Sequence, residues 1–174
     1  MEYRIIKLIE YLIQNCIFLK FYNIFKGEAL MIYLNCGVKG SGKTKILIDL
    51  ANEKLRDAKG NLVFIDSNHE ISRALNRNIR FIALNEFNVD NLSKMNGLIS
   101  GIIAKDYDVE SIFVDGLLKN TSESLEDSNQ FFEDLEKISD EFDVDMYINI
   151  SSHKDLVPDF LRKYNFIEGN FQNN

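Results

Sequence analysis

One eight-residue segment, residues 37–44, constrains the fold of this chain more than any other feature. It fits the pattern G-x-x-x-x-G-K-[ST] at every fixed position, namely Gly37, Gly42, Lys43 and Thr44. The apolar residues 31–36 before it predict a buried strand, and residues 45–57 after it predict a helix. In such a strand–loop–helix unit, backbone N–H groups and the helix dipole attract a phosphate. The alternative is a glycine-rich turn with chance basic residues.

We therefore predict a nucleotide site on this loop. Lys43 would reach the β- and γ-phosphates, and the Thr44 hydroxyl would take one coordination position of Mg²⁺. No N-K-x-D element, which would favour guanine, occurs in the sequence, so ATP is the expected nucleotide. The predicted nucleotide-binding residues are the whole loop: Gly37, Val38, Lys39, Gly40, Ser41, Gly42, Lys43 and Thr44.

Alternating apolar and amphipathic segments predict the rest of the fold. Further strands are expected at residues 62–66, 79–84, 111–115 and 145–150, and helices at about 90–103, 124–140 and 155–164. Nearly continuous apolar strands alternating with helices indicate an α/β protein, a three-layer sandwich with a mainly parallel sheet of about five strands. Gly97 and Gly101 are expected to mark close packing of their helix on this sheet.

Asp115 is the best candidate for a second functional residue, because it directly follows an apolar strand. In open parallel sheets the site lies beyond the carboxyl ends of the strands. An acid at that position suits a role in holding Mg²⁺ through water, opposite Thr44. The alternative is an acid that merely ends a strand. We predict Lys43 and Asp115 as catalytic residues and Thr44 and Asp115 as the metal-binding pair.

Two other strand ends carry polar residues that could take part in the chemistry. After the second strand, Glu70 or Asp66 could orient the attacking water, and His69 could bind a phosphate or simply be solvated. After the strand at 145–150, a serine could sense the γ-phosphate. Equally, Ser152 could cap the following helix through the N–H of Asp155.

The first thirty residues differ from the rest, so we divide the chain into an extension, 1–30, and a nucleotide-binding domain, 31–174. The longest uncharged stretch of the extension, residues 11–19, is far shorter than the roughly 20 residues that span a bilayer. An amphipathic helix is one hypothesis. The hypothesis we favour is translated upstream sequence, because residues 26–28 can be encoded by a ribosome-binding site and Met31 opens the first strand.

The composition of the chain limits the classes of partner that it is expected to bind. The net charge of −7 argues against a broad nucleic-acid footprint, so no nucleic acid is expected. Two cysteines, Cys16 and Cys36, are typical of a reduced, cytoplasmic protein, and no transmembrane segment is expected. Residues 123–145 are strongly acidic, with Lys137 as the single base. They form either a solvated helix face or a docking surface for an unknown basic protein partner.

From Met31 onward the chain resembles RecA-like P-loop ATPases, including the KaiC-like group. The resemblance rests on residues 37–44 (GVKGSGKT, the Walker A pattern), 64–69 (FIDSNH) and 109–115 (VESIFVD). It implies a P-loop NTPase sandwich. In the recombinases, F-I-D-A-E-H supplies a water-activating glutamate, whereas this chain has Asn68 there, and Gly116 stands where many relatives have a glutamate after the aspartate. Glu70 is the candidate substitute. The chain is similar also to short uncharacterised bacterial P-loop proteins sometimes labelled twitching-motility or PilT-like, although it lacks the pilus-motor acid and histidine boxes.

Three functions are compatible with these residues. The first is an ATP·Mg²⁺-binding protein that acts as a slow ATPase or nucleotide switch. The second is a small-molecule kinase of the nucleoside type, which needs a pocket for its acceptor. The third is an ATP-binding interaction module without hydrolysis, which the neutral Asn68 and Gly116 would favour.

Overall fold

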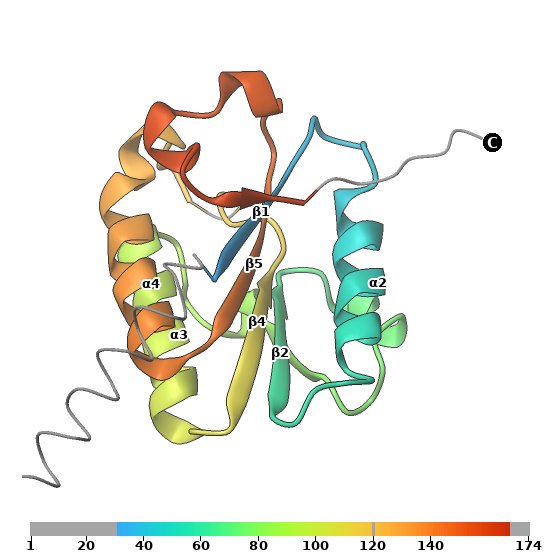
Figure 1. The fold of residues 1–174 in the computed structure, drawn as a ribbon. Coiled ribbons are helices and arrows are strands. Elements are labelled where there is room, and N and C mark those ends of the chain that lie inside the picture. Colours follow the sequence, from blue (N-terminus) through green and yellow to red (C-terminus); the bar gives the residue numbers. More distant parts are fainter. Residues whose placement is uncertain (1–30, 120, 168–174) are drawn as a thin grey trace, which may run out of the picture.

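The computed structural model describes residues 31–119 and 121–167, and both hypotheses on residues 1–30 lie outside this part. Its centre is a six-stranded parallel sheet with the order β3-β2-β4-β5-β1-β6 (Figure 1). The predicted α/β class with a mainly parallel sheet is confirmed; the sheet gains a short sixth strand beside β1. The strands are β1 (Ile32–Cys36), β2 (Asn61–Asp66), β3 (Arg80–Ala83), β4 (Val109–Val114), β5 (Asp145–Ile150) and β6 (Asn165–Phe166).

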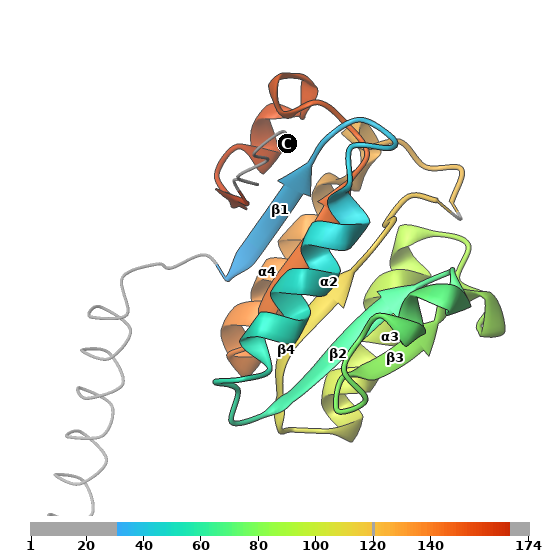
Figure 2. The ribbon, with the colours of Figure 1, turned by 90° about the vertical axis from the view of Figure 1, so that its right-hand side faces the viewer.

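Helices cover both faces of the sheet. α2 (Lys43–Lys54) packs on one face, and α3 (Leu92–Lys105) and α4 (Asn129–Phe142) pack side by side on the other (Figures 1 and 2). The buried strand residues alternate between the two faces, as the period of two requires. Ile65, Ile112 and Ile148 join the core below α3 and α4, whereas Phe64, Phe113 and Tyr147 join the core below α2. Three layers result.

A row of aromatic rings crosses the sheet below α2. Tyr33, Tyr147, Phe113, Phe64 and Phe81 are register partners on β1, β5, β4, β2 and β3. Neighbouring rings stack with centroid distances of 4.6, 4.7, 6.1 and 6.5 Å. Such pairs stabilise a sheet beyond their buried area. The row fixes the register of the strands whose ends carry the candidate site.

The predicted helix at residues 155–164 is wrong. The structure has two short 3₁₀ turns there, Lys154–Leu156 and Asp159–Leu161. Pro158 lies between them, and Val157 before it is extended, with φ −73° and ψ 144°. A residue before proline is sterically pushed away from the helical region, which explains the break.

Two details on α3 and α4 also differ from prediction. A Cβ added at Gly97 or Gly101 would meet no atom within 4 Å, so the predicted close packing on the sheet is wrong. The buried stripe of α3 runs through Met95, Ile99 and Ile102, which turns both glycines away from the sheet. α4 begins at Asn129, several residues later than expected, because a 3₁₀ turn at Glu126–Ser128 precedes it.

Candidate functional site

The glycine loop joins β1 to α2 at the carboxyl edge of the sheet. Gly40 and Gly42 have φ values of 85° and 83°, a left-handed conformation that glycine adopts without strain. A Cβ at Gly37 would lie 2.5 Å from Ser41 Oγ, so a side chain at this position would require the serine to move. Gly42 is the N-cap residue of α2, and no side chain caps the helix there. The first N–H groups of α2 are therefore left for another acceptor.

A cavity of about 700 Å³ opens over this loop. Of the eight predicted loop residues, Lys39, Gly40, Gly42, Lys43 and Thr44 line it, together with Asp115, Lys119 and Ser151. Gly37, Val38 and Ser41 are not among its lining residues, and the Val38 side chain is exposed instead. The structure thus brings most of the predicted loop residues and Asp115 to one cavity. Its size is in the range of small-molecule sites.

Lys43 is held inside the loop rather than in solvent. Its side chain is only 8% exposed, and Nζ donates hydrogen bonds to the carbonyl oxygens of Gly37 at 2.6 Å and Val38 at 2.8 Å. Burial lowers the pKa of the Lys43 ammonium, and the nearby Asp115 carboxylate opposes that shift. A positive charge that is desolvated and fixed in a loop interacts strongly with an anion.

Thr44 and Asp115 face each other across the cavity floor. The Thr44 hydroxyl donates to Asp115 Oδ2 at 2.5 Å. Asn149 Nδ2, on β5, donates to Asp115 Oδ1 at 2.9 Å. Asn35 Nδ2, on β1, lies 2.8 Å from Asn149 Oδ1 and 3.2 Å from the Lys43 carbonyl oxygen. We call these five residues, Asn35, Lys43, Thr44, Asp115 and Asn149, the inner cluster.

Sequence reasoning missed Asn35 and Asn149. Both are buried, and they are register partners on the adjacent strands β1 and β5. A buried amide needs hydrogen-bond partners, and here each amide orients the next group toward Asp115. The available signal was one polar residue inside each of two otherwise apolar strands.

Asp66 and Asp115 end neighbouring strands, and Lys119 Nζ lies between them. The ammonium is 3.7 Å from Asp66 Oδ1 and 3.6 Å from Asp115 Oδ2. Burial raises the pKa of Asp66 to about 6, and the adjacent Asp115 carboxylate adds to the rise. Burial acts in the same direction on Asp115, but hydrogen bonds from Thr44 and Asn149 outweigh it and lower its pKa. Asp115 is therefore the group that stays ionised.

Gly116 explains how Lys119 reaches these carboxylates. Its φ of 68° turns the chain sharply after Asp115, and a Cβ there would lie 2.3 Å from Lys119 Cδ. The Lys119 side chain therefore lies against the glycine. Sequence reasoning treated Gly116 only as the absence of a glutamate and did not identify Lys119.

The donor set at this floor fits Mg²⁺. Thr44 supplies a hydroxyl and Asp115 an ionised carboxylate, which are the hard oxygen ligands this ion prefers. Asp66 Oδ2 is buried and has no hydrogen-bond partner among the described residues. Within that part of the chain, no group of three or more His, Cys, Asp or Glu forms a metal cage. Such a cation would thus depend on phosphate oxygens for further ligands.

The residues after Asp66 form a separate, exposed turn, and we call residues 67–73 the outer turn. Asn68 Oδ1 accepts from the Glu70 N–H at 3.0 Å, and His69 Nε2 lies 2.6 Å from Glu86 Oε1. The Glu70 side chain is exposed and is not among the residues that line the cavity. The structure therefore does not bring the predicted Glu70 to Thr44 and Asp115.

The serines after β5 separate into two roles. Ser151 lines the loop cavity, as expected for a residue near a terminal phosphate. The predicted capping by Ser152 is wrong: His153 Nδ1 accepts from the Asp155 N–H, at 3.4 Å. His153 directly precedes the first 3₁₀ turn and is therefore closer to the Asp155 N–H along the chain than Ser152 is.

α4 makes up the middle of the acidic segment. Some of the segment's side chains bond within it, as in the pairs Asn129–Glu133 and Gln130–Asp134, whereas Glu136 bonds Lys163 outside it. The docking surface stays a prediction. Among the described residues, no helix combines the length and apolar composition needed to cross a membrane. Neither the family models nor the curated proteins compared with the chain gave a match.

Proposed function

We propose that this chain binds ATP·Mg²⁺ on the glycine loop and acts as a slow ATPase or nucleotide switch. The observation that carries the proposal is the Thr44–Asp115 hydrogen bond at the end of a loop with two left-handed glycines. The contact unites a hydroxyl from the start of α2 with an ionised carboxylate from the end of β4. No other pair of strand ends in the described residues joins a phosphate-type loop to an acid in this way.

In this proposal the backbone N–H groups of residues 39–44 and the start of α2 hold the phosphates. Lys43, already aimed along the loop, would exchange its two carbonyl partners for phosphate oxygens. Thr44 and Asp115 would hold Mg²⁺, which when bound neutralises charge that develops on the phosphates. Asn149 and Asn35 would keep Asp115 in place.

Slow turnover is part of the proposal because neither predicted base, Asp66 or Glu70, is free beside Thr44 and Asp115. Asn68 cannot accept a proton, and its side-chain oxygen already caps the outer turn. Glu70 is exposed in that turn, and Lys119 is paired with both Asp66 and Asp115. Hydrolysis at a useful rate would then need a partner or second subunit that completes the site, as arginine fingers do.

We infer that the fold is of the RecA-like P-loop class. Three features support this inference: the parallel sheet, the loop between β1 and α2, and Asp115 at the end of β4. In addition, β5 lies between β1 and β4, the two strands that carry the loop and Asp115. The resemblance of residues 37–44, 64–69 and 109–115 to such ATPases points the same way.

Phosphate release from ATP·Mg²⁺ by the purified full chain tests the proposed function. We expect turnover far below about 10 s⁻¹, the median for enzymes. Lys43→Ala measures the background from contaminating ATPases. Rapid hydrolysis by the isolated chain would contradict the switch, and tight binding with no release above background would favour the non-hydrolysing module. A phosphorylated second compound would favour the kinase.

A further inference from the structure

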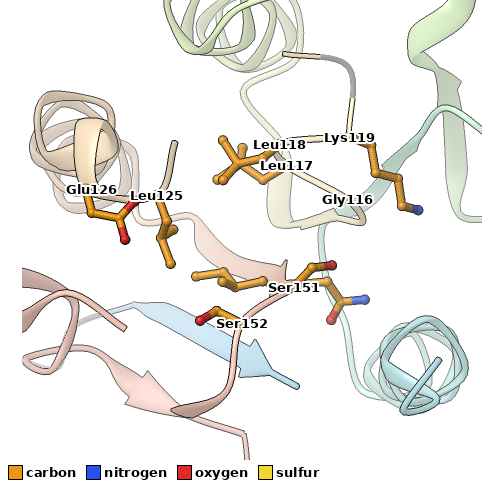
Figure 3. Close-up of a pocket in the computed structure, with 10 residues that line it drawn as sticks. Gly116, Leu117, Leu118, Lys119, Leu125, Glu126, Ser151 and Ser152 are labelled. Carbon is orange, nitrogen blue, oxygen red and sulfur yellow. The ribbon is translucent and has the colours of Figure 1, made fainter. Parts of the chain in front are cut away.

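A second cavity, of about 340 Å³, lies beyond the ends of β4 and β5 (Figure 3). Leu117 and Leu118 form one wall and Leu125 another, with Ile150 as a further apolar lining residue. The cavity is separate from the glycine loop, since none of residues 37–44 lines it. Its size and mainly apolar lining are typical of small-molecule sites.

The two cavities meet. Lys119 and Ser151 line both the second cavity and the cavity over the glycine loop. Lys119 Nζ is 3.6 Å from Asp115 Oδ2, the carboxylate assigned to Mg²⁺. A molecule in the second cavity would therefore touch the same side chains as the terminal phosphate of a nucleotide on the loop.

Polarity divides the second cavity into two ends. Figure 3 shows Gly116, Ser151 and the backbone of Lys119 at one end and Leu125 at the other, with Glu126 beyond Leu125. Ser151 Oγ makes no hydrogen bond to any described residue. A hydroxyl without a protein partner can both donate to and accept from an incoming oxygen atom.

We propose that this cavity is a second ligand site, for a small, mainly apolar molecule that carries a hydroxyl group. The apolar part packs against the leucines, and the hydroxyl lies at the end lined by Ser151 and Lys119. The hydroxyl thereby lies at the end that the two cavities share, beside the terminal phosphate of a nucleotide bound on the loop. The assignment rests on the proposed function, because the phosphate supplies the last wall of the polar end.

Benzyl alcohol is a suitable probe, because it combines one apolar ring with one hydroxyl. Saturation-transfer NMR on the full chain should detect it as a saturable ligand. Ser152→Phe fills the cavity from a residue outside the glycine-loop cavity and should weaken the signal at least about tenfold. Leu118→Trp fills it from the opposite wall and should act alike. Ser93→Phe, on the exposed side of α3, is the matched control and should change nothing.

Orientation is tested with Mn²⁺ and a non-hydrolysable ATP analogue bound to the same protein. Paramagnetic relaxation should be stronger for the methylene protons of benzyl alcohol than for its para proton. Stronger relaxation of the para proton would contradict the assigned polar end.

Separate titration of the ATP analogue distinguishes the two claims. If the analogue binds but benzyl alcohol gives no saturable signal, or one that both cavity-filling variants leave unchanged, the second site is wrong and the proposed function stands. If benzyl alcohol binds with the expected variant pattern but the analogue does not bind, the nucleotide function fails, and the proposed contact between the second ligand and the terminal phosphate fails with it.

Discussion

The inner cluster and the outer turn lie at the same edge of the sheet, yet their polar side chains are held very differently. In the inner cluster, Asn35, Asn149 and Asp115 are each no more than 3% exposed and are joined by hydrogen bonds across three strands. In the outer turn, His69 is 59% exposed and its partner Glu86 is 58% exposed. Both regions follow a strand, and from the sequence Asp115 was the stronger candidate and Glu70 and His69 the weaker ones.

The difference follows from their places in the sheet. β5 is flanked by β1 and β4, so the residues at its end are covered on both sides, whereas β2 has only the edge strand β3 on its outer side. Buried polar groups must be paired, and pairing fixes their geometry. Exposed groups have water as an alternative partner and are less constrained. Position after a strand therefore identifies a site only where neighbouring strands bury it.

The largest expected difference between the two regions is in nucleotide affinity. Asp115→Ala should weaken ATP binding about 10–100-fold in Mg²⁺, the usual cost of losing an outer ligand of a metal. In EDTA the variant and the wild type should bind alike. Glu70→Ala should stay within about twofold of wild type under both conditions. Calorimetric titration measures all of these affinities. If Asp115→Ala and Glu70→Ala weakened ATP binding equally, the inner cluster and the outer turn would not differ in function.

A stability comparison sharpens the same contrast. Asn149→Ala leaves Asp115 Oδ1 and Asn35 Nδ2 without one partner each in a buried site. We expect a loss of about 1–3 kcal/mol in the free energy of unfolding. Asn68→Ala removes only the exposed cap of the outer turn and should cost at most about 1 kcal/mol. Urea unfolding monitored by circular dichroism gives both values; a larger loss for Asn68 would contradict the account.

Asp66 should make stability depend on pH. Its pKa is raised from the ordinary 3.8 to about 6, so the folded state holds a proton that the unfolded state has released in this range. The free energy of unfolding should therefore fall as pH rises from about 4 to 6, by about 2 kcal/mol. The lowered pKa of Asp115 acts with the opposite sign, mainly at and below the lower edge of this window.

Asp66→Asn should abolish most of that fall, and Asp49→Asn, on α2, serves as a matched control that should retain it. Urea unfolding at a series of pH values between 4 and 7 provides the measurement. A wild-type stability that rises through this window would show that Asp66 is ionised in the folded state.

The smallest effect is expected for the His69–Glu86 pair of the outer turn. The two atoms are 2.6 Å apart, but both side chains are more than half exposed. His69→Ala should lower the free energy of unfolding by less than about 1 kcal/mol, as for other surface ion pairs. Glu86→Gln should have a similarly small effect. If His69→Ala lowered the free energy of unfolding by more than Asn149→Ala does, the outer turn would be the more constrained of the two regions.

Much of the fold could be predicted from local patterns. The apolar runs gave the main strands, and the glycine pattern identified the loop that two left-handed glycines require. The expected helix at 155–164 is wrong, although Pro158 within it was a signal against a continuous helix. β6 is two residues long and carries too little pattern to be recognised.

The inner cluster could be predicted only in part. Lys43, Thr44 and Asp115 follow from motif and position, but Asn35 and Asn149 are 114 residues apart and meet only once the strand order is known. Lys119 depends on the positive φ of Gly116, and a sequence does not reveal which way the turn directs the next side chains. The second cavity likewise arises from loops that converge in space.

Titration of ATP·Mg²⁺ and GTP·Mg²⁺ into the full chain and into Lys43→Ala, followed by calorimetry, tests the central claim most directly. Lys105→Ala, at the exposed end of α3, is the matched control. The account predicts selective ATP binding by wild type and by Lys105→Ala, and its loss in Lys43→Ala. Absence of binding to either nucleotide, or ATP binding that survives in Lys43→Ala, would contradict it.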